Sequence, residues 1–357
     1  NPSVYLNYIA SGVLSVRDMG NDPVYLQKLR AGIERRSIDA PDVYPMGFID
    51  KRGPYAAPTG RLVDTLAEAR AAVAAYASEG YAGIKLYSSI EPSWIPVLTG
   101  DASALGLRTV GHIPPHISPA QAIRSGYREI THINMLLLEL IGDLTVDTRT
   151  PERFIVPGER GGSIDVTSSQ AQAFIDLMLK YKVAHDPTLA TFLSQYRSRP
   201  GEVAFRAVPY ADHLPASLRR AQVRSVSYNH HKEDAFQRTG EVALKFIKRL
   251  HDSGVQLLPG TDASLPGFAL VSELECYALA GIPNEEVLAL ATLGTARYMG
   301  QENTLGSVEV GKKAYLMLID GDPVASLSAL RKVALVIKGD TSFDAKEILR
   351  AQGIRPF

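Results

Sequence analysis

Short apolar runs alternate with longer stretches of helical periodicity through most of the chain. The apolar runs end in polar residues, and the helical stretches begin at capping residues such as Asp22 and Pro23 or stop at glycines such as Gly80. We predict strands at residues 13–20, 43–49, 83–87, 107–113, 129–133, 184–190 and 255–263. We predict helices at residues 22–36, 62–80, 93–106, 118–126, 168–183, 235–254, 268–281 and 284–300. Such β/α alternation is typical of a parallel sheet with helical crossovers.

The number of predicted strands indicates a barrel that is one strand short. Seven strands precede residue 264, whereas a closed (β/α)8 TIM barrel needs eight, and the natural gap lies before residue 1. We therefore predict that residues 1–300 form an α/β barrel of strands 2–8 with strand 1 missing from this sequence. Residues 301–357 are rich in strands and glycine turns, and they predict the C-terminal part of a small β-sandwich appendage plus a terminal helix.

Composition excludes several classes of protein. The 357 residues carry 38 Lys and Arg against 38 Asp and Glu, so the basic stripe that nucleic-acid binding needs is not expected. The single cysteine, Cys276, excludes an intrachain disulfide framework. No apolar run is long enough to span a membrane, so a soluble protein is expected, and its compartment stays open.

Metal-competent side chains stand at the ends of three separate predicted strands. They are His112 in TVGHIPP, His132 in EITHIN and Asp262 in LLPGTDAS. Barrel active sites lie at this end of the strands, and two imidazoles with a carboxylate suit a divalent metal, with Zn²⁺ as a leading candidate. Taken singly, each histidine reads more simply as a core or loop residue, and the aspartate as a helix N-cap. Their shared placement favours the metal site.

Lys85 stands in the middle of the predicted strand GIKLY. A lysine in a buried parallel strand is costly, because its charge leaves water without an obvious partner. A structural reason for this residue is hard to find, whereas a site at the strand ends would account for it.

These segments together resemble the metal-dependent amidohydrolase superfamily. The resemblance is carried by GIKLY, by TVGHIPP with AQAIRSGYREITHIN, and by PGTDAS with the following SELECYALAGIPNEEVLALATLGTARYMG and LGSVEVGKKAYL. The branch most similar to this sequence contains the imidazolonepropionase-like and Xaa-Pro dipeptidase-like hydrolases.

The resemblance implies one or two divalent metal ions, with Zn²⁺ favoured, at the mouth of the barrel. It implies that Lys85 is carboxylated by CO₂ and that Lys85, His112, His132 and Asp262 are metal ligands. Asp262 would also act as general base for the attacking water. The implied reaction is hydrolysis of an amide or peptide bond in a small substrate, such as a dipeptide or an N-acyl amino acid.

Three further residues are candidates for contacts with substrate. Tyr87 points to the same side as Lys85, because strand side chains alternate, and its phenol could bind the substrate carbonyl; a packing role at the rim is equally compatible. Arg17 could pair with a substrate carboxylate, although a structural pair with Asp18 or another acid is favoured. His185 could contact substrate or support the site from behind.

The sequence departs from the family in one important respect. The family carries a His-x-His pair at the end of strand 1, and this sequence has none; its one close pair is His230-His231. The piece carrying strand 1 is absent from the printed sequence, held as a separate chain, or lacking in the protein. We favour the first two explanations, because a barrel missing one strand exposes two unpaired edges.

Two rival functions stay open. A catalytically impaired homologue could act as a binding protein, which the missing His-x-His pair would explain. A one-metal deaminase is the other, and Lys85 argues against it, because those sites lack a carboxylated lysine. As partners we expect a small-molecule or peptide substrate and copies of the same chain in a homo-oligomer, with neither nucleic acid nor a membrane. The exact substrate is set by loops and cannot be read from the fold.

Overall fold

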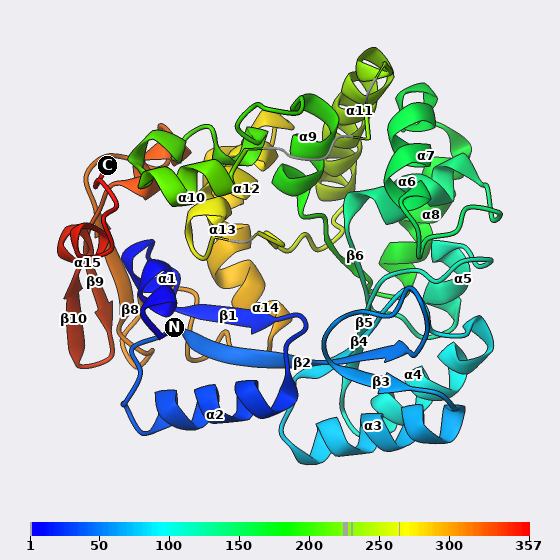
Figure 1. Ribbon diagram of the computed structural model, residues 1–357, viewed down its shortest axis with the longest axis horizontal. Helices are drawn as coiled ribbons and strands as arrows, with labels where there is room; N and C mark the ends of the chain where they lie inside the picture. The colour runs from blue at the N-terminus through cyan, green and yellow to red at the C-terminus, as the bar shows by residue number, and fades with distance from the viewer. Residues whose placement is uncertain (1, 224–227, 230, 264) are drawn as a thin grey trace.

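A computed structural model describes residues 2–223, 228–229, 231–263 and 265–357. Its main sheet is parallel and contains β1 (Ser15–Asp18), β2 (Asp42–Lys51), β3 (Arg61–Val63), β4 (Gly83–Leu86), β5 (Arg108–Gly111), β6 (Glu129–Thr131) and β7 (Ala184–Asp186). The strands follow the order β1-β2-β4-β5-β6-β7, and β3 pairs with β2 outside this path. The sheet is curled, so the predicted TIM-barrel-like α/β arrangement is confirmed at this level (Figure 1).

Helices follow the strands of this sheet along the chain. They are α2 (Pro23–Glu34), α3 (Leu66–Ser78), α4 (Ile95–Ala104), α5 (Pro119–Arg124), α6 (Ile133–Ile141), α7 (Glu152–Arg160), α8 (Ser169–Lys180), α9 (Leu189–Arg197), α10 (Ala216–Ala221), α11 (Glu233–Asp252), α12 (Phe268–Leu279), α13 (Asn284–Ala289) and α14 (Thr295–Tyr298). Capping residues in the local sequence determine where several of these helices begin. The side chain of Asp22 accepts the Tyr25 N–H at the start of α2, and Ser118 forms a capping box with Gln121 in α5.

The principal core lies between the curled sheet and its helices. Large side chains that are fully buried there include Tyr76, Tyr127, Tyr196, Phe236 and Phe246. The strand register brings Lys85 level with Phe48 on one neighbouring strand and Val110 on the other. Lys85 is therefore held in the middle of the sheet, as its position in GIKLY predicted. Among the described residues, no helix has both the length and the apolar character needed to cross a membrane.

A second sheet lies at one side of the molecule, where both chain ends are found (Figure 1). It is antiparallel, in the order β10-β9-β8, with β8 (Tyr315–Ile319), β9 (Val333–Lys338) and β10 (Thr341–Asp344). Helices α1 (Leu6–Ala10) and α15 (Ala345–Ala351) pack against it. The appendage is rich in strands, as predicted. In the described part of the chain it is a single three-stranded sheet, so a two-layered sandwich is not seen.

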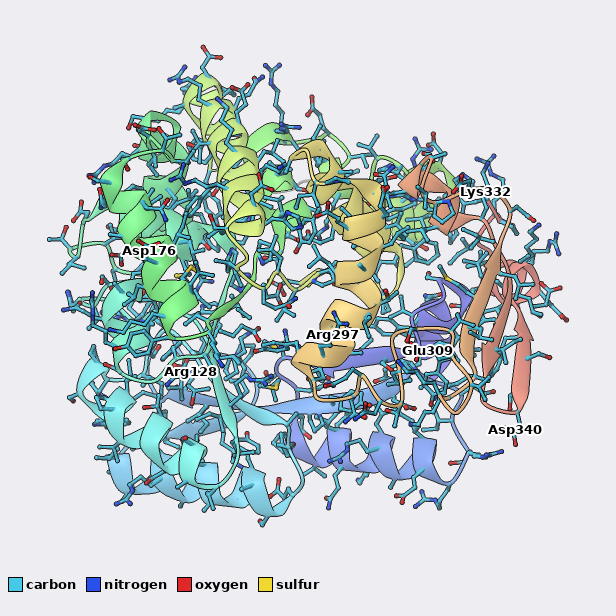
Figure 2. All side chains as sticks on the ribbon, turned by 180° about the vertical axis from the view of Figure 1, so that it is seen from behind. Arg128, Asp176, Arg297, Glu309, Lys332 and Asp340 are labelled. Carbon is cyan, nitrogen blue, oxygen red and sulfur yellow. The ribbon has the colours of Figure 1, made fainter. Side chains whose placement is uncertain are left out.

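Ion pairs and a tyrosine attach the appendage to the start of β2. The Tyr315 hydroxyl donates to Asp42 Oδ2 at 2.8 Å, and Lys338 Nζ lies 2.9 Å from Asp42 Oδ1. Asp340 lies at the tip of the β9–β10 hairpin, where Figure 2 labels it, and it pairs with Arg36 at 2.8 Å. Tyr315 thus contributes to this attachment.

Several predicted elements differ from the structure. The strand predicted at 184–190 ends at Asp186, and α9 begins at Leu189. Residues 255–263 form no strand; only Leu257 makes an isolated parallel bridge to His185, because Pro259 lacks an N–H and Gly260 turns back onto Leu258. The helix predicted from residue 62 begins at Leu66, after the Thr65 cap, and residues 61–63 form β3 instead.

Helix α6 was not predicted. Its sequence, INMLLLELI, is apolar on nearly every side and is buried, so it lacks the amphipathic period by which a surface helix is recognised.

Candidate active site

The candidate site residues meet in a cavity of about 570 Å³ at the carboxyl ends of the strands. Its walls include six residues singled out from the sequence, Lys85, Tyr87, His112, His132, Asp262 and Arg17, together with three more polar ones, Thr131, Asp186 and Thr188. Segments distant in the chain supply them, because parallel strands bring their carboxyl ends to one edge. The structure therefore assembles every candidate ligand around one space.

Lys85 is buried, with 8% of its surface exposed. Its Nζ lies 5.6 Å from the centre of the Phe48 ring and 6.0 Å from that of Tyr87. Among the described residues it has neither a hydrogen bond nor an ion pair. Burial lowers the pKa of this amine, although the charges of Asp262 and Asp186 oppose that shift. An unpaired lysine at this depth is what the sequence led us to expect.

His112 follows β5 and presents one ring nitrogen without a partner. Its Nδ1 lies 3.0 Å from Ser88 Oγ, whereas its Nε2 is buried and has no hydrogen-bond partner among the described residues. The ring packs against Tyr87 with centroids 4.1 Å apart. Burial lowers the pKa of His112 well below its ordinary value, so the ring is neutral at neutral pH and competent to bind a metal.

His132 follows β6 and stands beside His112. The two ring centroids lie 4.7 Å apart, in an edge-to-face arrangement. The Nδ1 of His132 lies 2.7 Å from Thr188 Oγ1, and burial lowers its pKa to about 3. Hydroxyl groups thus engage one nitrogen of each imidazole, an arrangement that commonly orients metal-binding histidines.

Asp262 lines the same cavity from the segment that follows Leu257. It is exposed, and its φ of +42° places it in the left-handed region that non-glycine residues seldom adopt. The Thr191 hydroxyl donates to the neighbouring Thr261 carbonyl at 2.7 Å and so anchors this segment to α9. The exposed carboxylate leaves Asp262 accessible from the mouth of the cavity.

The three candidates for substrate contact lie in different places. Tyr87 lines the cavity, as expected. Arg17 lines it too, but its guanidinium donates to both carboxylate oxygens of Glu129, at 2.6 and 2.9 Å, and lies 3.5 Å from Asp186. His185 is fully buried, its Nδ1 lies 2.9 Å from the Ile130 carbonyl, and it is not among the lining residues.

Two buried acids were not chosen from the sequence: Asp186, which lines the cavity, and Glu129, which does not. Glu129, at the start of β6, is fully buried and accepts from Arg17 and from the Tyr298 hydroxyl. Burial raises the pKa of Asp186 to about 7, and its Oδ1 is buried without a partner among the described residues. Asp186 lies at the end of a strand, which is where barrel active-site residues are expected from sequence. Glu129 lies at the start of its strand, and nothing in the sequence marks it as a site residue.

A metal fits this donor set only if Lys85 takes part. In the described part of the chain, no three His, Cys, Asp or Glu side chains lie close enough together to hold an ion. The unpartnered Nε2 of His112, the adjacent His132 and the unpaired Lys85 are nevertheless gathered around one space. A neutral amine does not satisfy a hard cation, whereas its carboxylated form would supply two anionic oxygens.

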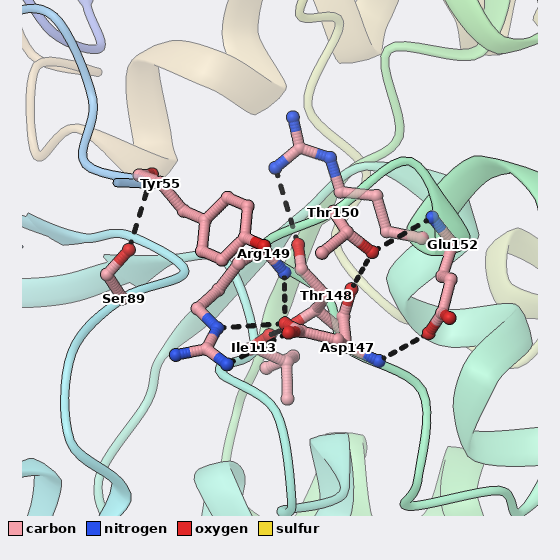
Figure 3. Close-up of polar contacts among 9 residues, drawn as sticks. Tyr55, Ser89, Ile113, Asp147, Thr148, Arg149, Thr150 and Glu152 are labelled. Carbon is pink, nitrogen blue, oxygen red and sulfur yellow. Dashed lines mark hydrogen bonds and ion pairs between the residues drawn. The ribbon is translucent and has the colours of Figure 1, made fainter. Parts of the chain in front are cut away.

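A loop after α6 contacts the segment that contains Ile113, as Figure 3 shows. The Thr148 hydroxyl donates to the carbonyl of Ile113, the residue after His112, at 2.8 Å. Asp147 accepts from the backbone and guanidinium of Arg149, whose charge lies 5.4 Å from the ring of Tyr55. The segment that follows His112 is thus held by a second loop through the hydroxyl of Thr148.

Comparison with known proteins gives a family match in the C-terminal half. The model of the amidohydrolase family matches residues 202–342. A curated relative from Moorella thermoacetica, a 5-methylthioadenosine/S-adenosylhomocysteine deaminase, is 34% identical over 85 residues. That alignment covers 21% of this chain and only 20% of the relative.

Solved structures share the fold over nearly the whole chain. A Xaa-Pro dipeptidase with bound methionine has a TM-score of 0.65 at 20% identity, covering 96% of this chain and 77% of its own. A prolidase complexed with N-methylphosphonate-L-proline has a TM-score of 0.66 at 20% identity, covering 96% and 78%. Bottromycin amidohydrolase has a TM-score of 0.67 at 18% identity, covering 99% and 78%.

These findings confirm the resemblance to the amidohydrolase superfamily that the sequence predicted. The family pattern is present over residues 202–342, and the fold is that of the Xaa-Pro dipeptidase-like structures. At 20% identity or below, those structures establish the fold and leave activity and substrate to be argued from this chain's own residues.

Proposed function

We propose that this chain is a member of the amidohydrolase superfamily and that its activity is metal-dependent hydrolysis of an amide or peptide bond. The substrate is small, such as a dipeptide or an N-acyl amino acid. One observation carries the proposal: Lys85, His112, His132 and Asp262, chosen from sequence alone, line a single cavity. The amidohydrolase match and the dipeptidase-like fold support the same class of reaction.

The proposed ligands are Lys85 in carboxylated form, His112, His132 and Asp262. They would hold one or two divalent ions, with Zn²⁺ as the first candidate. A bound divalent ion supplies a lowered pKa for water and polarisation of the scissile carbonyl. Carboxylation of Lys85 also accounts for a lysine that is buried without a partner among the described residues.

Asp262 is the proposed general base. Its accessible carboxylate takes a proton from the attacking water, whose oxygen forms the new bond to the carbonyl carbon. The C–N bond then breaks, and the same proton passes from Asp262 to the leaving nitrogen, giving a carboxylic acid and an amine. Tyr87 lines the cavity beside His112 and is proposed to donate a hydrogen bond to the carbonyl oxygen.

Arg17 and His185 receive supporting roles instead of direct contact with substrate. The guanidinium of Arg17 is already engaged by Glu129 and Asp186, which leaves it poorly placed to bind a substrate carboxylate. His185 lies behind the wall of the cavity, with its Nδ1 at the Ile130 carbonyl. We therefore propose that both shape the cavity.

A second candidate function is that of an impaired homologue that binds a ligand without hydrolysing it. It is favoured by the absence, among the described residues, of three His, Cys, Asp or Glu side chains within ligating distance of one ion. The alternative of a deaminase is supported by a match over 85 residues only. The buried, unpaired Lys85 argues against it.

The test is hydrolysis of a panel of dipeptides and N-acyl amino acids by the protein supplied with Zn²⁺ and bicarbonate. We expect turnover that Lys85→Ala abolishes and that short carboxylic acids partly restore in this variant. Full activity of Lys85→Ala would contradict the ligand role. Saturable binding of a panel compound without turnover would favour the impaired homologue.

A further inference from the structure

The turn from β7 into α9 holds His132 at three points. The His132 N–H donates to the Asp186 carbonyl at 2.7 Å, and the next residue's N–H, of Ile133, donates to the Pro187 carbonyl at 3.0 Å. The third contact joins His132 Nδ1 and Thr188 Oγ1, 2.7 Å apart. The position and the ring orientation of His132 therefore depend on residues 186–188.

Both partners in the third contact have a strained backbone. The φ angle is +71° at His132 and +44° at Thr188, in the left-handed region that residues with a Cβ seldom occupy. Such conformations persist only where surrounding contacts hold them. Something must therefore hold the turn at Thr188 in place.

Thr188 is the N-cap residue of α9, but it does not cap the helix with its side chain. A threonine at this position ordinarily accepts a hydrogen bond from an N–H group of the first helical turn. Here Glu273 of α12 takes that place: its Oε1 accepts from the Leu189 N–H at 2.8 Å, and its Oε2 from the Ala190 N–H at 2.7 Å. The hydroxyl of Thr188 is thereby available to His132.

Glu273 is fully buried, and both of its oxygens are used in this way. Burial raises the pKa of Glu273 to about 8, and the two backbone hydrogen bonds at the start of α9 oppose that shift. Its neighbour two positions along, Glu275, instead forms an ion pair with Arg331 and is only partly buried. The two acids of the SELECY segment thus do different things, and only Glu273 reaches the turn behind the cavity.

We propose that Glu273 is a positioning residue that acts on His132 through Thr188. It caps α9 in place of the threonine, fixes the turn, and so leaves the threonine hydroxyl to accept the His132 Nδ1–H. The lone pair of His132 Nε2 is then available to bind the metal ion. This inference rests on the proposed function only in treating His132 as a metal ligand.

The first test is a double-mutant cycle read out by binding of Co²⁺ alone. Glu273→Gln places an amide N–H₂ against one of the two backbone donors, and Thr188→Val removes the hydroxyl while keeping the side-chain shape. We expect each change to weaken Co²⁺ binding about 10-fold or more, as loss of groups that orient a ligand commonly does. The double variant should bind nearly as well as the weaker single variant, because both act through one contact.

Matched variants show whether the effect is specific. Thr188→Ser keeps the hydroxyl and should retain Co²⁺ binding. Glu275→Gln removes the neighbouring acid and its ion pair but should leave Co²⁺ binding unchanged. Unchanged Co²⁺ binding by Glu273→Gln, or fully additive effects in the double variant, would overturn the proposal. If Glu273→Gln does not fold, Thr188→Val, which leaves Glu273 in place, carries the test against its matched control Thr188→Ser.

The second test needs neither metal nor activity, so it separates this proposal from the proposed function. Nuclear magnetic resonance of metal-free protein with nitrogen-labelled histidine reports which ring nitrogen of His132 carries the proton. We expect Nδ1–H in the wild type and in Glu275→Gln, and a mixture of tautomers in Glu273→Gln and Thr188→Val. An unchanged tautomer in both variants would overturn the positioning role. Failure of the wild type to bind Co²⁺ would count against the proposed function alone.

Discussion

The two candidate histidine ligands are held by similar contacts on different kinds of backbone. Ser88 Oγ lies 3.0 Å from His112 Nδ1, and Thr188 Oγ1 lies 2.7 Å from His132 Nδ1. A buried carboxylate stands behind each hydroxyl-bearing turn. Asp50 accepts the N–H of Ser89 at 2.9 Å, much as Glu273 accepts those of the turn that carries Thr188.

The difference lies in where each carboxylate comes from. Asp50 is on β2, which pairs directly with β4, so the sheet itself places Asp50 next to the turn that carries Ser88. Glu273 reaches its turn from α12, 83 residues further along the chain than Ala190, and the backbone it supports is strained at two residues. The His112 side is therefore built by strand pairing, and the His132 side by long-range hydrogen bonds. We expect single substitutions to damage the second side more.

The largest effect is expected from Arg17→Met, which breaks the ion pair beneath the His132 side. Glu129 would be left fully buried without its bidentate partner, which costs about 3–5 kcal/mol of unfolding free energy in comparable cases. Urea unfolding measures this change. Arg36→Met, which removes an exposed ion pair, is the matched control and should leave stability nearly unchanged. Equal effects of the two substitutions would contradict a buried ion pair at this place.

Because the backbone on the His132 side is strained, we expect Thr188→Val to weaken Zn²⁺ binding more than Ser88→Ala does. Loss of a group that orients a ligand commonly costs about 10–100-fold in metal affinity, and we expect Thr188→Val to lie within this range. Ser88→Ala should lie at or below its lower end, because the strands around His112 stay paired. Calorimetric titration with Zn²⁺ gives both values. A larger loss of Zn²⁺ affinity in Ser88→Ala would contradict the view that the His112 side is the more rigidly held of the two.

His185, behind the His132 side, should make stability depend on pH. Burial lowers its pKa to about 4, below the ordinary value near 6.5, so the unfolded chain binds a proton first as the pH falls. His185 therefore costs nothing above pH 6.5, and it lowers the unfolding free energy progressively between pH 6.5 and about 4. The loss should reach about 2 kcal/mol by pH 5.

His185→Asn isolates this effect from other groups that titrate in the same range. Asparagine can still donate to the Ile130 carbonyl but does not titrate. Urea unfolding at pH 7 and pH 5 should show the wild type losing about 2 kcal/mol more than the variant over this interval. Parallel losses in the two proteins would mean that His185 is not held neutral by burial.

The smallest effect is expected from Asp50→Asn on the His112 side. Asp50 accepts the N–H groups of Ala57 and Ser89, each at 2.9 Å, and asparagine can satisfy only one of these donors. We expect a loss of about 1 kcal/mol in unfolding free energy and little change in Zn²⁺ affinity. A loss of Zn²⁺ affinity as large as that in Glu273→Gln would show that both sides depend equally on their carboxylates.

Much of the framework could be predicted, because it follows from local patterns. Alternating strands and helices, and polar residues at strand ends, were enough to place Lys85, His112, His132 and Asp262 around one cavity. Their roles as ligands stay predictions, as do the division at residue 300, the homo-oligomer and the metal itself. The strand expected near Leu257 is reduced to one bridge, because Pro259 and Gly260 interrupt pairing after it.

The supporting contacts could not be predicted, because they join segments far apart in the chain. Glu273 reads in the sequence as an ordinary helical residue, and nothing local separates it from Glu275. Arg17 and Glu129 lie 112 residues apart and meet only when the sheet curls. His230 lies outside the described residues, and its neighbour His231 is exposed.

The proposed function depends most directly on a metal ion that Lys85, His112 and His132 bind together. The decisive measurement is the Zn²⁺ content per chain of the wild type and of Lys85→Ala, after both are equilibrated with Zn²⁺ and bicarbonate and then freed of unbound ion. We predict at least one Zn²⁺ per chain in the wild type and its loss in the variant. A wild-type chain that retains no Zn²⁺, or a variant that retains as much as the wild type, would contradict the account.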